Sequence, residues 1–170
     1  MVYENENFRP HIYSTKEKET IYREVPYEKV EFVQKNPTEY EISLKNIKSS
    51  TYLNFSESFH PDWKLRAGNF SWLGAIMSKN YFLPDVFHIK NDANLNSFKV
   101  DPRFIKENYP GSYRQNPDGS INVDLTLYFK PQSWFYLGLI ISGTTLIGCL
   151  GYLVWDFVKR RKGGKKTEKG

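Results

Sequence analysis

Cysteine is nearly absent from the 170-residue chain, and histidine is scarce. The single cysteine, Cys149, lies inside a long apolar segment near the C-terminus. One cysteine excludes an intramolecular disulfide and a cysteine-based zinc site. The three histidines have no metal-ligand spacing such as H-x-x-x-H, so no metal site is predicted: His11, His60 and His88.

The sequence also lacks the motifs of common enzyme classes. It contains no G-x-S-x-G, no P-loop and no dinucleotide-binding fingerprint. We therefore predict no catalytic residue and no cofactor, and the sequence alone does not make the chain an enzyme.

Basic residues are in excess only in the C-terminal tail. Residues 159–170 contain seven of the 24 lysines and arginines and one of the 19 acids. The first 158 residues therefore carry 17 bases and 18 acids, a formal net charge of −1. Because the body of the chain has no basic excess, it is not expected to bind nucleic acid.

One long apolar segment is present, residues 131–155, and no Asp, Glu, Lys or Arg interrupts it. As a helix with a rise of ~1.5 Å per residue it is roughly 37 Å long, which exceeds a hydrocarbon core of about 30 Å. Trp134 and Tyr136 mark one end, and Tyr152 and Trp155 mark the other, as expected for rings at the lipid headgroups. We predict a transmembrane helix; the alternative is a buried core helix.

We assign the predicted transmembrane helix to residues 131–158 and a basic cytoplasmic tail to residues 159–170. The tail opens with four consecutive basic residues: Lys159, Arg160, Arg161 and Lys162. Because such residues stay cytoplasmic and attract anionic lipid, we expect this chain to cross the cell membrane once, with an extracytoplasmic N-terminal domain. No secretory signal opens the sequence. Either the topology is reversed, or the chain is the C-terminal piece of a longer membrane protein, which we favour.

Alternating polar and apolar residues predict strands between residues 27 and 130. Tyr40, Ile42 and Leu44 alternate with polar neighbours, and a later strand places five apolar residues on one face: Ile121, Val123, Leu125, Leu127 and Phe129. Turn residues separate these runs. We therefore predict a mainly β domain over 27–130, an antiparallel β-sandwich of jelly-roll character.

Two segments are expected to differ from this β pattern. Asp101 followed by Pro102 is typical of a helix start, which predicts one short helix ending near Asn108. Residues 1–26 are rich in charge and contain two prolines. We expect them to form an N-terminal linker or an arm packed on the domain.

The best candidate for a ligand site follows the third predicted strand. A carboxylate, an imidazole and an indole occur close together there, with further carboxylate and amide groups in a later loop: Glu57, His60, Asp62, Trp63, Asp92, Asn94 and Asn96. An exposed ring can stack on the apolar face of a sugar while polar groups fix its hydroxyls. The alternative, which we favour, is that Trp63 belongs to the core and His60-Pro61 shapes a turn.

Small residues four apart occur twice in the apolar segment. They are the pairs Gly138/Ser142 and Thr144/Gly148. Such pairs let membrane helices approach closely, so this face is predicted to pack against other transmembrane helices. The alternative is the ordinary tolerance of glycine in a membrane helix.

Three stretches carry a resemblance: Ser56-Glu-Ser-Phe-His-Pro-Asp-Trp-Lys64, Asn91-Asp-Ala-Asn-Leu-Asn96, and Tyr128-Phe-Lys-Pro-Gln132 just before the last helix. Over residues 27–158 the chain resembles the C-terminal end of bacterial multispanning membrane proteins of the YfhO type and related glycosyltransferases of the GT-C architecture. In those proteins an extracytoplasmic β-domain precedes the final span. The family pattern has Gly before the Trp, where this chain has Asp62. The family's catalytic acids lie near its first spans, which no part of this chain matches.

The resemblance implies a membrane-anchored accessory β-domain, not catalytic by itself, of a glycosyltransferase-like protein in cell-envelope glycan or glycolipid assembly. The partners it implies are the lipid bilayer, other transmembrane helices of the parent protein, and a glycan or polyprenyl-linked sugar. One alternative is a single-pass, tail-anchored interaction protein without a glycan role. Another is a stand-alone envelope assembly factor.

Overall fold

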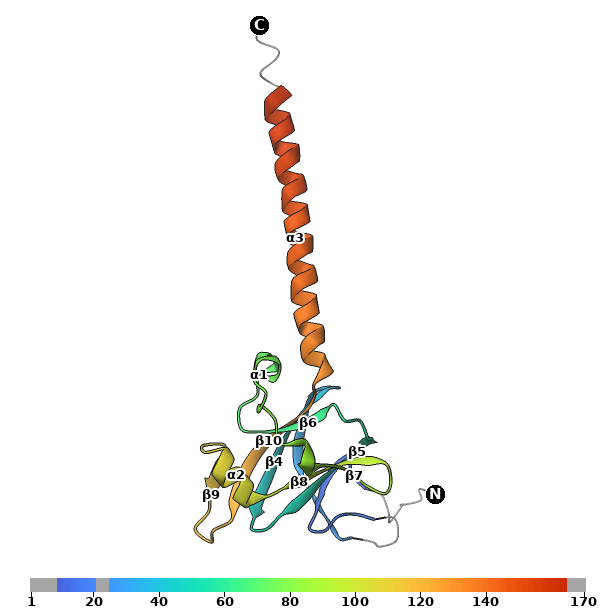
Figure 1. Cartoon of the computed structure of the whole chain (residues 1–170), viewed down its shortest axis with the longest axis vertical. Helices are drawn as coiled ribbons and strands as arrows, with labels where there is room; N and C mark the ends of the chain where they lie inside the picture. The colour runs from blue at the N-terminus through green and yellow to red at the C-terminus, as the bar shows by residue number, and fades with distance from the viewer. Residues whose placement is uncertain (1–8, 21–24, 165–170) are drawn as a thin grey trace, which may run out of the picture. The chain divides into compact units, whose positions relative to one another are not determined.

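The structure is a computed structural model that describes residues 9–20 and 25–164 (Figure 1). The chain divides into two compact units, residues 1–131 and residues 132–170. The first unit contains the β-strands and the second consists of the C-terminal part of one long helix, so each is described by itself.

The first sheet has five strands in the order β2-β1-β5-β8-β7. All of its neighbouring strands are antiparallel. Their bounds are β1 Ile12–Thr15, β2 Tyr27–Lys29, β5 Thr51–Ser58, β7 His88–Lys90 and β8 Leu95–Val100.

The second sheet runs in the order β3-β4-β10-β6, with the short strand β9 paired to β10. Its pairs are antiparallel as well. The bounds are β3 Glu31–Asn36, β4 Glu39–Ile47, β6 Trp63–Ala67, β9 Tyr113–Gln115 and β10 Ile121–Phe129. Together the two antiparallel sheets confirm the predicted β-sandwich.

Burial follows the predicted alternation along the two longest strands of the second sheet. In β4 the buried side chains include Tyr40, Ile42 and Leu44, and in β10 four of the five predicted apolar residues are buried: Ile121, Val123, Leu125 and Leu127. They form one core cluster with Phe55 and other apolar residues of the first sheet. Burying each large apolar side chain contributes about 1.5–3 kcal/mol, so this shared core holds the sheets together.

The structure distinguishes the two alternatives for residues 1–26, a linker or an arm packed on the domain, where it describes them. β1 lies inside the first sheet, where it pairs with β2 on one side and β5 on the other. All four of its residues are buried. The segment is thus part of the sandwich rather than a linker. The four residues of β1 are too few to show a periodic pattern. Because charged residues surround them in the sequence, the segment was not predicted as a strand. Residues 1–8 and 21–24 of the segment lie outside the described residues.

Short helices lie in the connections between strands. α2 (Pro102–Asn108) confirms the predicted helix: Asp101 is its N-cap, accepts a hydrogen bond from the backbone N–H of Arg103, and is followed by Pro102 in the first turn. The long connection from β6 to β7 contains α1 (Trp72–Met77) and the 3₁₀ turn η1 (Asp85–Phe87).

The second unit contains most of α3 (Pro131–Gly164), the apolar helix. Among the described residues it is the one helix long and apolar enough to cross a membrane, from Pro131 to Arg161. None of its most apolar window is buried in the structure, which argues against the alternative of a core helix. The helix continues past the predicted boundary at 158, because lysine and arginine are good helix formers. Residues 165–170 of the predicted tail lie outside the described residues.

Candidate functional site

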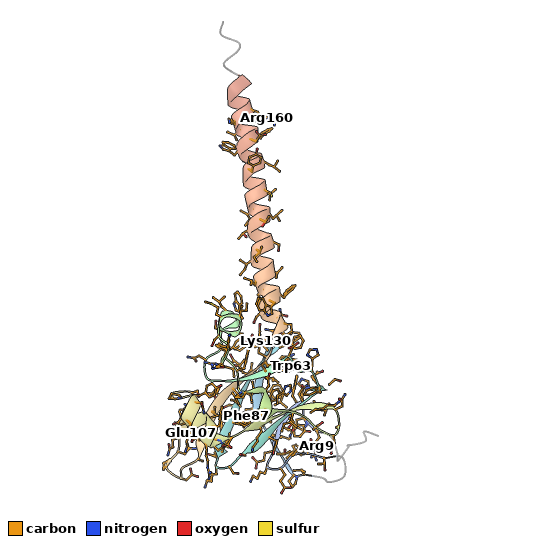
Figure 2. The ribbon with its side chains drawn as sticks, viewed as in Figure 1. Arg9, Trp63, Phe87, Glu107, Lys130 and Arg160 are labelled. Atoms are coloured by element: carbon orange, nitrogen blue, oxygen red, sulfur yellow. The ribbon has the colours of Figure 1, made fainter. Side chains whose placement is uncertain are left out.

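The predicted stacking residue Trp63 belongs to the core. It opens β6 with only 9% of its surface exposed (labelled in Figure 2). Its ring packs on Tyr40, Phe55 and Phe129 at centroid distances of 6.2, 4.8 and 5.3 Å. The expected sugar-stacking role of Trp63 is therefore corrected, and the alternative of a core ring holds. Alternation on β6 explains the burial, because Leu65 and Ala67 share the inward face.

Asn96 is fully buried and uses both ends of its amide inside the domain. Its Nδ2 donates to the carbonyl oxygens of Glu57 and Ser58, at 2.9 and 3.0 Å. Its Oδ1 accepts from the backbone N–H of His60 at 3.1 Å and lies 3.0 Å from Nε2 of His88. Since the Asn96 oxygen is only an acceptor, we assign the proton of His88 to Nε2. Asn96 thus holds the end of β5 in place, and its amide is not available to a ligand.

His60 and Asp62 shape the turn that joins β5 to β6. Nδ1 of His60 accepts a hydrogen bond from the backbone N–H of Asp62 at 3.2 Å. The His60 ring also meets the ring of Phe129 edge-on, 5.1 Å between centroids. The carbonyl of Asp62 accepts from the backbone N–H of Lys130 at 3.0 Å. The turn is therefore attached to the end of β10.

The remaining predicted ligand residues surround this turn with their side chains exposed. The Glu57 carboxylate is 3.9 Å from Nε2 of His11. Asn94 adopts a positive φ of 61°, and its carbonyl accepts from the N–H of Phe59 at 2.8 Å. Asp92 is exposed in the same loop as Asn94. The predicted residues thus lie at one end of the domain, but the Trp63 ring and the Asn96 amide are buried.

A larger hollow lies on the outer face of the second sheet. It is an open groove of about 1300 Å³ that we call the sheet groove. The outward residues of β4 and β10 form its floor, and loops after β6 and α2 line its sides. Floor residues include Glu39, Glu41, Ser43, Asp124 and Thr126.

Most of the acidic side chains that line the sheet groove have a basic partner. Lys35 lies 3.1 Å from Glu41, and Lys45 lies 2.6 Å from Glu31. Asp124 accepts a hydrogen bond from the Ser43 hydroxyl at 3.0 Å and lies 3.9 Å from Arg114. These ion pairs are exposed and contribute little to stability. The lining has more acidic than basic residues: Glu31, Glu39, Glu41 and Asp124 against Arg66 and Arg114.

Neutral hydrogen-bonding groups and aromatic rings complete the sheet groove. Its lining includes four asparagines and three aromatic residues: Asn69, Asn80, Asn108, Asn122, Phe70, Tyr109 and Tyr113. Amides and hydroxyls can donate or accept as a ligand requires. Aromatic faces beside them suit the apolar face of a sugar.

Arg66 is held in a fixed position in the lining of the sheet groove. Its guanidinium lies 4.2 Å from the ring centroid of Tyr81 and 5.7 Å from that of Tyr109. It also donates to the carbonyl of Tyr81 at 2.5 Å. The Tyr109 hydroxyl donates to the carbonyl of Phe82 at 3.1 Å, and burial raises the pKa of this tyrosine. These contacts form a preordered wall, which lowers the ordering cost of binding.

The sheet groove was not predicted from the sequence. One signal was available: the polar residues that alternate with the core positions of β4 and β10 must share the outer face. Their antiparallel pairing, for example Ser43 opposite Asp124, was not visible in the sequence.

The predicted helix-packing residues lie on α3. The Ser142 hydroxyl donates to the carbonyl of Gly138 at 2.8 Å, and the Thr144 hydroxyl donates to that of Ile141 at 2.9 Å. A methyl group added at Gly138 or Gly148 would meet no atom within 4 Å. Both glycines therefore leave room for close approach, and the packing partner stays a prediction.

The predicted topology signal forms the last turns of α3. Arg160 pairs with Asp156 at 2.8 Å, and the ammonium of Lys159 lies 5.0 Å from the Trp155 ring centroid. The guanidinium of Arg161 lies 4.5 Å from the Phe157 ring centroid. The side chain of Lys162 lies outside the described residues. Aromatic and basic groups thus meet at this helix end, as at a membrane–water boundary.

Comparison with known proteins identifies no relative for this chain. No protein-family model matches it, and neither a curated protein nor a solved structure does. Within residues 9–20 and 25–164, no group of three or more His, Cys, Asp or Glu side chains is placed to hold a metal ion.

Proposed function

We propose that the chain is a membrane-anchored, non-catalytic β-sandwich module that binds a glycan in the sheet groove. In this proposal α3 spans the cell membrane, the domain lies outside the cytoplasm, and the tail is cytoplasmic. The module is the C-terminal part of a glycosyltransferase-like membrane protein that acts in cell-envelope glycan or glycolipid assembly.

The chemistry of the sheet groove is the observation that carries the glycan proposal. Most of its acidic groups are paired with basic ones, and it has no excess of positive charge; the Asn69 and Asn80 amides lie in its lining beside aromatic rings. A phosphate-rich ligand would need an excess of positive charge, which this floor lacks. A neutral, hydroxyl-rich ligand fits the same groups, and the volume of about 1300 Å³ admits several sugar units.

Two observations support the membrane part of the proposal. The apolar length of α3 exceeds the thickness of a hydrocarbon core, and Lys159, Arg160 and Arg161 follow its apolar part. The parent function rests on the resemblance to glycosyltransferase-like proteins alone.

A binding experiment with a blocked groove tests the glycan proposal. The full chain, reconstituted in lipid nanodiscs, is screened against an array of soluble oligosaccharides, and hits are titrated by calorimetry. Ser43→Trp places an indole on the groove floor and should weaken binding at least about tenfold, because the ring would occupy the ligand's space.

The matched control is Lys99→Trp, which adds the same ring to β8 of the other sheet. It should leave the affinity unchanged. Equal affinities for both variants, or no saturable binding of any oligosaccharide by the wild-type chain, would refute the glycan proposal.

The alternative function is a tail-anchored interaction protein with its domain in the cytoplasm. A basic segment after a single apolar helix fits such an anchor too. Protease added to spheroplasts distinguishes the two. Digestion of residues 1–130 from outside supports the proposed topology, and protection of the domain supports the tail anchor.

A further inference from the structure

The short helix α1 exposes apolar side chains. Leu73 is 45% exposed and Met77 is 77% exposed, while Ala75 is the buried residue of the helix. Trp72 and Ile76 are partly exposed beside them. An indole, a leucine and a methionine on one exposed turn are typical of a segment that enters a lipid interface.

The segment around α1 is attached to the end of β10. The ring of Phe70 packs on the ring of Tyr128 at 4.5 Å between centroids. The ring of Phe82 lies parallel to the same Tyr128 ring at 6.5 Å. Figure 1 shows α1 at the end of the domain where β10 finishes. Three residues after Tyr128 the apolar helix begins at Pro131, a chain distance of at most about 10 Å. Covalent continuity therefore keeps the base of this segment close to the membrane surface whenever α3 is inserted.

Lysines surround a second hollow beside the same segment. This hollow has a volume of about 460 Å³, and we call it the lysine hollow. Its lining includes Lys64, Lys79 and Lys130, with Asp85 as an acidic neighbour. Lys64 is paired to Asp85 at 2.6 Å. The pairing leaves the charges of Lys79 and Lys130 in excess, which suits the phosphate of an anionic lipid headgroup.

We propose that α1 is a second membrane contact: Leu73 and Met77 insert into the lipid interface, and the lysine hollow holds an anionic headgroup. The inference rests on the proposed anchoring by α3. A bilayer is the one occupant that meets both the apolar turn and the lysines, because Lys130 directly precedes the apolar helix. The contact restricts how the domain is oriented on the membrane, and so which way the sheet groove faces.

A depth measurement on the full chain tests the contact. Cys149 is first replaced by Ser, and a single cysteine is then placed at Met77 and labelled with an environment-sensitive fluorophore. The protein is reconstituted in phosphatidylcholine vesicles with and without about 30% phosphatidylglycerol. With the anionic lipid, quenching by lipids spin-labelled near the headgroup should be at least about twofold stronger than for a cysteine at Ser49. Ser49 is the control because it is exposed and follows Ile47, which pairs with Ile121 at the opposite end of β10.

The outcomes separate this inference from the proposed anchoring. A fluorophore on the native Cys149 reports whether α3 is embedded. If Cys149 is embedded and Met77 stays as aqueous as Ser49, the α1 contact is overturned and the anchor survives. If Cys149 is also aqueous, the anchoring itself fails.

A charge experiment tests the headgroup half of the inference. The double variant Lys79→Gln/Lys130→Gln should reduce quenching at Met77 in anionic vesicles, whereas Lys99→Gln should not. Quenching that is equal in neutral and anionic vesicles, or unchanged in the double variant, overturns the headgroup site. Protection of Met77 in cells but not in vesicles would show that a protein covers α1 and would overturn the lipid contact.

Discussion

Replacing Asn96 should destabilise the domain more than any exposed substitution nearby. In Asn96→Leu four groups lose their partner: the carbonyls of Glu57 and Ser58, the N–H of His60 and the Nε2–H of His88. An unsatisfied group costs about 1–3 kcal/mol when buried, and these groups lie near the surface, so the low end applies to each. The expected loss is about 4 kcal/mol in the free energy of unfolding, or roughly 12 °C in Tm for a domain of this size.

Chemical denaturation of the full chain in detergent measures this loss. The control is Asn94→Gly, two residues away, where glycine accepts the positive φ without strain and the exposed side chain is dispensable. It should change the free energy of unfolding by less than about 0.5 kcal/mol. A loss below about 1 kcal/mol for Asn96→Leu would contradict the assigned hydrogen bonds, because water would then replace the amide at little cost.

Two further predictions concern the core and the pH dependence of folding. Trp63→Ala should cost about 3–5 kcal/mol in denaturation of the same protein, since the ring contacts both sheets; a loss under about 1 kcal/mol would place the ring at the surface instead. Burial lowers the pKa of His88, so the unfolded chain binds a proton at higher pH than the folded domain does. The stability that neutral His88 provides is therefore complete above about pH 6.5 and decreases as the pH falls below it. Unfolding free energies at about pH 7.5 and 5.5 should show this decrease in the wild type and a smaller one in His88→Gln; equal decreases would contradict the assignment.

The parts of the fold that were predictable are those with a local pattern. β10 shows period-two alternation along its length and β4 shows it from Glu39 to Lys45, and α2 has a helix-start signal at Asp101. β1 has neither an alternating pattern nor a helix-start signal. Its four buried residues are positioned by pairing with β5, about 40 positions later in the sequence. Long-range pairing of this kind leaves no local trace in the sequence.

Local patterns described the candidate site less well than they described the fold. The residue types around His60 suggested a ligand surface. The core alternative for Trp63 was open to the sequence, because Leu65 and Ala67 alternate with Lys64 and Arg66, but a sequence cannot show that the Asn96 amide is already satisfied. The sheet groove requires the register between β4 and β10 and the placement of loops after β6 and α2. Both are products of the assembled sandwich, so the groove became visible only with the structure.

Two of the three stretches on which the resemblance was based, residues 56–64 and 128–132, contact each other at the base of the domain. The turn at His60–Asp62 contacts the end of β10 through the His60–Phe129 ring pair and the hydrogen bond from Lys130 to Asp62. Lys130 is the last residue before the apolar helix begins, so these contacts fix the point at which the chain leaves the domain. A fixed exit of this kind suits a β-sandwich joined directly to an apolar helix, whatever the sandwich binds. These stretches therefore bear on the proposed membrane attachment, whereas the glycan proposal rests on the sheet groove alone.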